Sequence, residues 1–537
     1  MKKVPALLLI FTCFSFSLFA QLEDAWVYLI DKQNVTASIN NPISILTQKA
    51  IDRKSAHGVV IDARDVPVNE TYIIQLKIAT GIIVMAKSKW FNAVHVRGSQ
   101  TDVQALTTLG FVDTIDFADK NLNAKSTNKQ KNKSKLEGVF TTFNYGNALN
   151  QIEMFNGDEL HLANYTGTGM TVAVLDAGFP NAHTMTSFKR IRDAGNLLGS
   201  YDFVNRDVDV YTGTTSNHGI LVLSDMAGYI ENQFVGTAPD ASFYLFITED
   251  APNENPVEES YWVEAAERAD SLGVDIINTS LGYTTFDNAN YNYTPADMDG
   301  NTAYITKGAN IAFEKGLLMV TSAGNSGSSG VGVPADSQYV LSIGAVDALG
   351  AYATFSSVGS DIQPSQKPDV VAQGQTSFVI TENDVIAAAN GTSFSSPILA
   401  GGIVCLWQAL PGKTNAEIMQ LVRASASQYS TPDYFLGYGI PNLESALNNA
   451  LSLEPNLVND ISIKIYPNPI KDKFYIQLPS GDNITTLHLY DILGKEINTY
   501  SVSHNNNIVD IAYLPKGIYV IKLVLNTISK TLKLIKQ

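Results

Sequence analysis

Short apolar runs alternate with helical patterns through the middle of the chain. The apolar runs lie at residues 170–175, 242–247, 274–279, 317–321 and 340–346. Between them, stretches such as 258–270 and 301–314 carry apolar side chains at the three- and four-residue spacing of an amphipathic helix. Buried strands that alternate with helices are typical of a parallel sheet covered by helices on both faces. We therefore expect an α/β domain over residues 137–450.

Two smaller regions flank this domain. Residues 21–119 mix strand-like and helix-like segments, which predicts a small α+β domain. A Lys-, Asn- and Ser-rich stretch at residues 120–136 has almost no apolar side chains, so it is interpreted as an exposed linker that proteases can cut. After a second linker at residues 451–460, residues 461–537 alternate apolar and polar positions between Pro and Gly turns, which predicts a small β-sandwich.

The chain begins with a short leader. Two lysines precede an apolar stretch over residues 4–19 that is too short to span a membrane. This pattern is typical of a secretory signal peptide over residues 1–20, cut after Ala20. With Cys13 in the leader, Cys405 is the one cysteine that follows it, so we expect no internal disulfide in the mature protein.

The chain is acidic, with a net charge of −16, and the acidic residues gather in the central domain. Residues 137–450 hold 10 Lys or Arg against 34 Asp or Glu, which argues against binding to the phosphates of nucleic acids. Carboxylates are also calcium ligands, and Asp202, Asp207 and Asp209 lie close together in the chain. A structural calcium site is one interpretation of this cluster, and a solvated acidic surface is the other.

A serine lies where a glycine turn leads into an apolar helix. The segment Gly391-Thr-Ser393-Phe-Ser-Ser-Pro397 precedes an apolar run that ends at Leu410. Because a proline in the first helical turn loses no hydrogen bond, the helix is expected to begin at or just after Ser393. Its free N–H groups and dipole would then favour negative charge beside the serine hydroxyl. Taken alone, Ser393 could equally be a helix cap.

Two upstream residues could supply the partners that a serine nucleophile needs. Asp176 follows the apolar strand 171–175, at the sheet edge where α/β proteins build their sites. His218 opens a helical pattern directly after Asn217. Each could be an ordinary turn or capping residue. However, a serine hydroxyl needs a base to take its proton, and the base needs a carboxylate to fix its tautomer.

The chain order Asp176, His218, Ser393 is also the order in subtilisin, and the chain resembles the subtilisin-like (S8) serine proteases. The resemblance rests on Val-Leu-Asp176-Ala-Gly, His218-Gly and Gly-Thr-Ser393-x-Ser-x-Pro. The chain departs from the family pattern at Ala177, where Ser or Thr is usual, and at Ile220, where Thr is usual. The resemblance implies a subtilisin-like fold in which Ser393 attacks a peptide carbonyl, His218 moves the proton and Asp176 orients His218.

The resemblance extends to two loops that follow predicted strands. Asn325 is implied to donate a hydrogen bond to the oxyanion, together with the backbone N–H of Ser393. Alone, it would be interpreted as part of an ordinary Gly-Asn turn. The residues implied to bind the substrate are Ser280, Leu281, Gly282, Ser322, Ala323 and Gly324. Without the other motifs, the segment before Ser280 would be interpreted only as a core strand.

The flanking regions also resemble parts of secreted proteases. By position and pattern, residues 21–119 resemble a prodomain that assists folding and occupies the active site until it is cut away. An independent binding domain is the alternative. Residues 461–537, with motifs such as Ile465-Tyr-Pro-Asn-Pro469 and Leu514-Pro-Lys-Gly-Ile-Tyr519, resemble the C-terminal sorting domain of type IX secretion. A substrate-binding or carbohydrate-binding module is the alternative there.

The interpretation that unites these features is a secreted serine endopeptidase acting on proteins or peptides. It needs no cofactor for its chemistry, and its other partners would be its own prodomain and the type IX secretion machinery. It would be released, or held at the outer cell surface, by a double-membraned bacterium. One alternative is a catalytically silent subtilisin-like scaffold that only binds peptides. An esterase of the α/β-hydrolase fold would need Gly-x-Ser-x-Gly and the order Ser, Asp, His, which the order seen here opposes.

Overall fold

The computed structural model describes residues 21–123, residues 143–451 apart from 215, and residues 464–537 apart from 478–484, 492–495, 504–506 and 526–527. The predicted leader, residues 124–136 of the first predicted linker and residues 452–460 of the second lie outside the described residues. The chain divides into two units, Met1–Ser452 and Leu453–Gln537, and each is described by itself.

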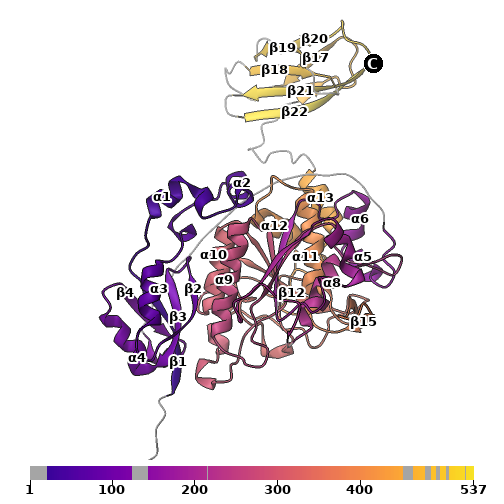
Figure 1. The fold of residues 1–537 in the computed structure, drawn as a ribbon. Coiled ribbons are helices and arrows are strands. Elements are labelled where there is room, and N and C mark those ends of the chain that lie inside the picture. The colour runs from indigo at the N-terminus through magenta and orange to yellow at the C-terminus, as the bar shows by residue number, and fades with distance from the viewer. Residues whose placement is uncertain are drawn as a thin grey trace, which may run out of the picture. The chain divides into compact units, whose positions relative to one another are not determined.

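A seven-stranded parallel sheet forms the centre of the first unit, with the strand order β13-β12-β11-β10-β5-β9-β6 (Figure 1). Its strands are β5 (Thr171–Asp176), β6 (Leu197–Asp202), β9 (Ser242–Ile247), β10 (Ile276–Thr279), β11 (Leu318–Ser322), β12 (Val340–Val346) and β13 (Val370–Gln373). The predicted apolar runs match five of these strands to within two residues at each end. The expected parallel α/β sheet is therefore confirmed.

The side chains of β5 alternate between two hydrophobic cores, one on each face of the sheet. Val172 and Val174 pack into a core with α8 (His218–Ala227) and α11 (Thr392–Gln408). Ala173 and Leu175 pack into a second core with α9 (Val257–Leu272) and α10 (Tyr304–Glu314). All four strand residues are fully buried, as expected for a strand covered on both faces.

Shorter elements complete this domain. Helices that add to the first core are α5 (Leu149–Glu153), α6 (Gly157–Leu162), α7 (Lys189–Asp193), α12 (Asn415–Ala424) and α13 (Leu443–Leu451). Two small antiparallel pairs are β7 (Tyr229–Ile230) with β8 (Phe234–Val235), and β14 (Ser377–Ile380) with β15 (Ile386–Ala389). No helix of the described residues has the length and apolar character needed to cross a membrane.

Helix α11 is buried on all sides. Two glycines allow its neighbours to approach, since a Cβ atom at Gly401 would lie 2.0 Å from Thr237 Oγ1 and one at Gly402 would lie 2.5 Å from the Phe155 ring. The helix begins at Thr392, slightly earlier than predicted, and Pro397 therefore lies in its second turn rather than in its first. There the proline removes the N–H that would otherwise bond to the Ser393 carbonyl.

The N-terminal domain is a four-stranded antiparallel sheet of order β2-β3-β1-β4 that packs against α9 and α10 (Figure 1). Its elements are β1 (Leu22–Leu29), α1 (Val35–Asn40), α2 (Gln48–Ala56), α3 (Glu70–Lys77), β2 (Ile83–Ser88), β3 (Ala93–Ser99), α4 (Gln100–Ala105) and β4 (Val112–Phe117). At the contact with the central domain, the Trp26 ring stacks on Tyr304 with centroids 4.5 Å apart. The Trp26 indole N–H also donates to Ser260 Oγ at 2.8 Å.

The second unit consists of two antiparallel sheets that share one hydrophobic core. One sheet has the order β16-β17-β20 and the other β19-β18-β21-β22. The strands are β16 (Lys464–Tyr466), β17 (Lys473–Gln477), β18 (Thr485–Tyr490), β19 (Glu496–Val502), β20 (Ile508–Asp510), β21 (Gly517–Leu525) and β22 (Ile528–Lys536). Phe474 from the first sheet and Leu487 from the second are both fully buried in this core.

Candidate active site

The residues singled out in the sequence lie at one edge of the parallel sheet. Asp176 is the last residue of β5, and Ser280 and Ala323 directly follow β10 and β11. In a parallel sheet, the carboxyl ends of neighbouring strands meet at the same edge. His218 and Ser393 lie at the starts of α8 and α11, the two helices that cover one face of this sheet.

Asp176 and His218 are in direct contact. The Nδ1 atom of His218 lies 2.8 Å from Asp176 Oδ1, and the same oxygen accepts the backbone N–H of Ala177 at 2.7 Å. Asp176 is fully buried, whereas the His218 side chain is 30 % exposed. With the carboxylate on Nδ1, the neutral ring carries its proton there, and Nε2 is left as the basic nitrogen.

The surroundings of His218 keep its basicity high. Burial acts to lower the pKa of His218, but the charge and the hydrogen bond of Asp176 outweigh burial and raise this pKa above its ordinary value of 6.5. The imidazole therefore accepts a proton readily, as a general base must.

The Ser393 hydroxyl lies beside β10. Its Oγ donates to the Ser280 carbonyl at 3.2 Å, and the Ser280 hydroxyl donates back to the Ser393 carbonyl at 2.9 Å. This second bond occupies the acceptor that Pro397 leaves free within α11. Among the described contacts, Ser393 Oγ bonds to Ser280 and not to His218, while the ring of the next residue, Phe394, has its centroid 6.1 Å from that of His218.

Asn325 is fixed by the residue that precedes the serine. Its Oδ1 accepts the backbone N–H of Thr392 at 2.8 Å and the Thr392 hydroxyl at 3.0 Å. A Cβ atom at Gly391 would lie 3.5 Å from Asn325 Nδ2 and 3.6 Å from the backbone nitrogen of Ser393. The two N–H donors therefore flank one small space, which Gly391 keeps open.

The six residues implied to bind substrate divide into two groups. Leu281 is half-buried and Gly282 is exposed, so their backbone is accessible, while Ser280 is buried and bonded to Ser393. The second group, Ser322 to Gly324, is packed into the domain. Ser322 and Ala323 are buried, and the Gly324 N–H donates to the Thr392 hydroxyl at 3.2 Å, which ties this loop to the start of α11.

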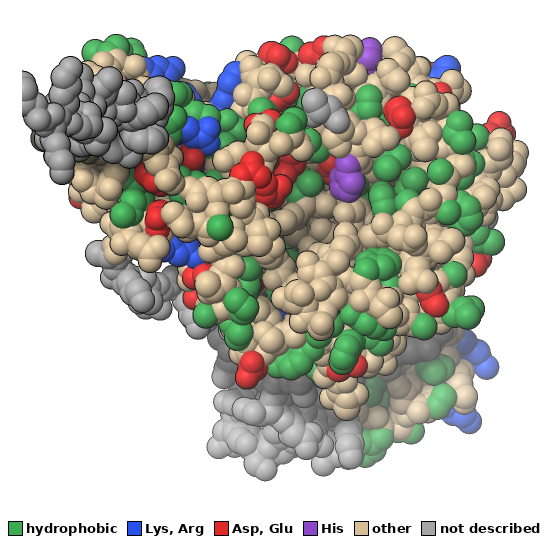
Figure 2. All heavy atoms as spheres, turned by 90° about the horizontal axis from the view of Figure 1, so that it is seen from below, with side chains coloured by type: hydrophobic (Ala, Val, Ile, Leu, Met, Phe, Trp, Pro, Cys, Tyr) green, Lys and Arg blue, Asp and Glu red, His purple; other side chains and the backbone are tan. Residues whose placement is uncertain are grey.

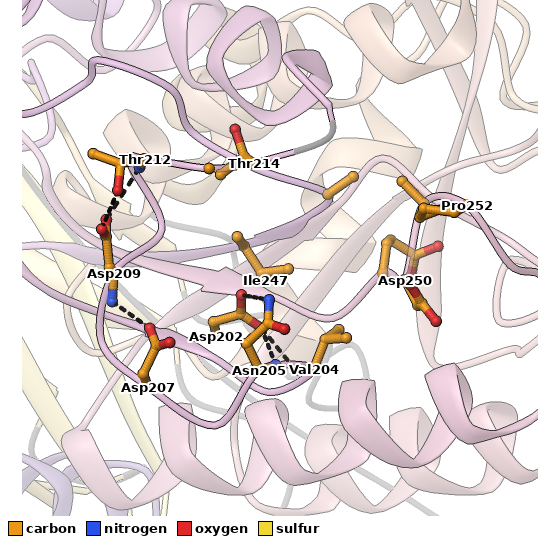
Figure 3. Close-up of a pocket in the computed structure, with 14 residues that line it drawn as sticks. Asp202, Val204, Asn205, Asp207, Asp209, Thr212, Thr214, Ile247, Asp250 and Pro252 are labelled. Atoms are coloured by element: carbon orange, nitrogen blue, oxygen red, sulfur yellow. Dashed lines mark hydrogen bonds between the residues drawn. The ribbon is translucent and has the colours of Figure 1, made fainter.

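An acidic pocket of about 300 Å³ lies next to Asp176 and was not predicted from the sequence (Figure 3). Its walls include Ala177, the Asp202 loop and the segment 249–252 that follows β9. Figure 2 shows acidic side chains gathered close to a histidine on this face of the molecule. Because the segment follows a strand of the same sheet, the strand-end rule that identified Asp176 could also have identified it.

Glu249 lines this pocket and lies close enough to Asp176 and His218 to interact with both electrostatically. It accepts a hydrogen bond from the Tyr283 hydroxyl. Burial raises the pKa of Glu249 to about 8, the Tyr283 hydrogen bond acts against this rise, and the charges of Glu254 and Asp176 add to it. A largely protonated carboxyl therefore lies near the Asp176–His218 pair at neutral pH.

The carboxylates suggested as calcium ligands bond within their own loop. Asp202 Oδ1 accepts the N–H groups of Val204 and Asn205, both at 2.8 Å. Figure 3 shows Asp207 bonded to the backbone of Asp209, and Asp209 bonded to Thr212. The described part of the chain contains no group of three or more His, Cys, Asp or Glu side chains placed to hold a metal ion. Calcium binding stays a prediction.

Three family models match this chain, one in its N-terminal region, one in its central region and one in its C-terminal region. The family model "Subtilase family" matches residues 167–439. "Peptidase S8 propeptide domain, Bacteroidota" matches residues 24–135, and "Secretion system C-terminal sorting domain" matches residues 464–537.

Individual relatives match the central domain. Subtilisin NAT of Bacillus subtilis subsp. natto is 30% identical over 301 residues, which cover 55% of this chain and 70% of that protein. Subtilisin of Bacillus pumilus is 29% identical over 301 residues, which cover 55% of this chain and 97% of that protein. Among solved structures, MycP3 protease from the type VII (ESX-3) secretion system matches with a TM-score of 0.46 and 20% identity, covering 59% of this chain and 92% of that one.

Proposed function

The chain belongs to the subtilase family of serine-type endopeptidases, and we propose that it hydrolyses peptide bonds through an acyl-enzyme formed on Ser393. The observation that carries this proposal is the 2.8 Å contact between Asp176 and His218 at the sheet edge where α11 presents Ser393. Asp176 and His218 are 42 residues apart in the chain, and their contact supports the proposal because a serine nucleophile needs a base held in a fixed orientation.

The proposed first half-reaction follows from this geometry. The Ser393 hydroxyl turns from the Ser280 carbonyl toward His218, whose Nε2 takes the proton as Ser393 Oγ attacks the substrate carbonyl. Asp176 holds the imidazole in the required tautomer and stabilises the imidazolium that forms. The new oxyanion would lie between Asn325 Nδ2 and the Ser393 N–H, the donors that flank the space at Gly391.

Collapse of the intermediate completes the cycle. The imidazolium of His218 gives its proton to the leaving amine, which leaves the acyl group on Ser393. Water, deprotonated by the same imidazole, then hydrolyses the ester. In this proposal, the accessible backbone of Leu281 and Gly282 pairs with the substrate main chain as an added strand.

The matches to a propeptide domain and a sorting domain support export of the peptidase. The sorting domain points to secretion through the type IX system. We propose that the protein is made as a zymogen with a cleavable leader, and that it acts outside the cell or at the outer cell surface.

Covalent labelling tests the proposed triad. A fluorophosphonate probe reacts with an activated serine, so the processed wild type should be labelled, and Ser393→Ala and His218→Ala should lose both labelling and peptide hydrolysis. His183→Ala, which removes an exposed histidine of the same domain, is the matched control and should keep both. If the folded, processed wild type were neither labelled nor active, the peptide-binding scaffold would be the better interpretation.

A further inference from the structure

The acidic pocket beside Asp176 gathers carboxyl groups without a cation among the described residues. Its lining includes the carboxyl groups of Asp202, Asp207, Asp209, Glu249 and Asp250. Within the described residues, the ion pairs of the peptidase domain involve none of these five groups. Like charges around one cavity repel each other, so a cation that entered the acidic pocket would be attracted by all of them.

These carboxyl groups surround a cavity rather than one point. Asp202 and Asp209 accept N–H groups of their own loop, and Asp250 Oδ2 accepts the side-chain N–H of Asn253 at 3.0 Å. The described residues include no group of three or more His, Cys, Asp or Glu side chains placed to hold a metal ion. A metal ion needs several ligands around one point, so the acidic pocket suits a cation carried on a long side chain better.

The acidic pocket also has apolar walls. Its lining includes Ala177, Val204, Ile247, Ala251 and Pro252, and its volume is about 300 Å³ (Figure 3). Lysine and arginine bury their methylene stems against apolar surface and keep the charged end among polar groups. The lining therefore matches both parts of such a side chain.

Glu249 is held in a fixed orientation at the acidic pocket. Its Oε1 accepts the hydroxyl of Tyr283, which is 1% exposed and directly follows the segment proposed to pair with substrate. No hydrogen bond from the described residues reaches its other oxygen, Oε2. This oxygen is therefore free to accept a hydrogen bond from an ammonium or guanidinium group, and such a cation favours the ionised carboxyl.

The acidic pocket lies on the opposite side of β10 from the Asn325 loop. In the sheet, β10 has β11 as one neighbour and β5 as the other, and β9 follows β5. Asn325 follows β11, whereas Glu249 and Asp250 follow β9, whose last residue pairs in register with Asp176. A substrate that pairs with the end of β10 thus passes between the two.

The alternation of an extended chain decides which substrate residue can reach the acidic pocket. Successive side chains of an extended peptide point to opposite sides. In the proposed complex, the residue that carries the scissile carbonyl faces residues 322–324 after β11. The residue directly before it then points toward β5 and β9, where the acidic pocket lies. The side chain one position further from the cut points away again.

We propose that the acidic pocket binds a lysine or arginine side chain of the substrate, at the position directly before the residue whose carbonyl Ser393 attacks. Glu249 and Asp250 then determine specificity at this position. This inference rests on the proposed function, because it names the substrate class of the same site. It predicts a peptidase that prefers basic polypeptide segments.

Matched peptides test the preference. Internally quenched peptides carry lysine or uncharged norleucine at this position, or arginine or uncharged citrulline, with the rest of the sequence constant. The processed wild type should cleave the charged member of each pair with a kcat/KM about tenfold higher or more. A lysine moved one position further from the cut should lose most of this gain. Equal kcat/KM for the lysine and norleucine peptides, with and without a calcium chelator, would overturn the proposal.

A variant then tests the acidic pocket itself. Glu249→Gln combined with Asp250→Asn removes two of the five acidic groups with little change of shape, so the preference for lysine over norleucine should fall about tenfold. Asp361→Asn removes an exposed carboxylate of the same domain outside the acidic pocket, and it should keep the preference of the wild type. An equal loss in both chains would assign the preference to the overall negative charge and contradict the proposal.

Fluorophosphonate labelling separates a failure of this inference from a failure of the proposed function. A labelled chain that cleaves both peptides equally well would retain the triad and refute the acidic pocket. A folded, processed chain with neither labelling nor cleavage would refute the triad and this inference with it. Should the double variant lose labelling, Asp250→Asn alone leaves the Tyr283–Glu249 bond intact, and its preference should fall about threefold. An unchanged preference in that chain would equally count against the proposal.

Discussion

Glu267 of α9 should make the contact between the propeptide and peptidase domains depend on pH. Its carboxyl accepts three hydrogen bonds from the end of β2 and the turn that follows it: from Ser88 Oγ at 2.5 Å, from the Lys89 N–H at 2.9 Å and from the Trp90 N–H at 2.9 Å. Burial raises the pKa of Glu267 to about 7, although the charge of Lys89 and these hydrogen bonds act to lower it. Once the propeptide domain leaves, this carboxyl meets water and its pKa should return to its ordinary value of 4.5.

The sign and size of the effect follow from that difference. Because the pKa is higher in the docked state, docking takes up a proton at intermediate pH. The contribution to docking is complete below about pH 4.5 and is lost as the pH rises through 7. The whole difference corresponds to about 3 kcal/mol, and the part that falls between pH 6 and 8 corresponds to about a tenfold weaker contact at the higher pH.

The assay uses the full chain with Ser393→Ala and with a recognition sequence for a site-specific protease placed within residues 126–135. After cleavage there, the dissociation rate of the propeptide fragment is measured from pH 6 to pH 8. Glu267→Gln cannot ionise, so its rate should lack the pH dependence that Glu267 contributes. Glu231→Gln, an exposed change in the same domain, should retain that dependence. Other groups at the contact, such as His95, which lies 2.8 Å from both Asp24 and Ser260, are present in all three chains, so the comparison isolates Glu267. Identical pH dependence with and without Glu267 would refute the reasoning.

Three further predictions concern the peptidase domain. Gly391→Ala places a methyl group between the two proposed oxyanion donors at a φ of +151°, so kcat should fall about a hundredfold or more with little change in KM, and an unchanged kcat would exclude this space as the oxyanion site. Asp176→Asn removes the charge that outweighs the burial of His218, so kcat should drop steeply and the acid limb of the pH–rate profile should move to lower pH; an acid limb that stays in place would show that another group controls it. Tyr283→Phe removes the phenol donor from Glu249, so thermal unfolding in the Ser393→Ala chain should show a loss of about 1 to 3 kcal/mol that grows above pH 8, where this carboxyl ionises, whereas a loss independent of pH would argue against that role.

Local sequence rules located much of the fold and of the site. The apolar runs define the strands because a strand covered on both faces must be apolar throughout, and this signal is contained within a few consecutive residues. Asp176 and His218 were found because the ends of parallel strands and the starts of helices have fixed places relative to the sheet. Their pairing was expected from that rule, from the chemistry of a serine nucleophile and from the resemblance to the subtilisin-like proteases, and the two side chains lie 2.8 Å apart.

Other features depend on pairings that no local pattern encodes. The mutual bonds of Ser280 and Ser393 join residues 113 positions apart. One of them, from the Ser280 hydroxyl to the Ser393 carbonyl, uses the acceptor that Pro397 leaves free in the second turn of α11. Lys54 looks like an ordinary surface lysine in the sequence, yet it is fully buried because Asp270, 216 positions away, is also buried beside it. Sequence patterns could not predict this burial, since it depends on how the two domains pack together.

Cys405, in the middle of α11, offers a built-in measure of how often the peptidase core opens. It is fully buried, its Sγ lies 3.3 Å from the Thr237 carbonyl, and burial raises the pKa of the thiol well above its ordinary value. A thiol reagent can reach it only when α11 separates from its neighbours, so the rate of chemical modification reports the frequency of that event. Since no other cysteine follows residue 13, mass spectrometry of the modified chain lacking its leader would assign each added group to this one position.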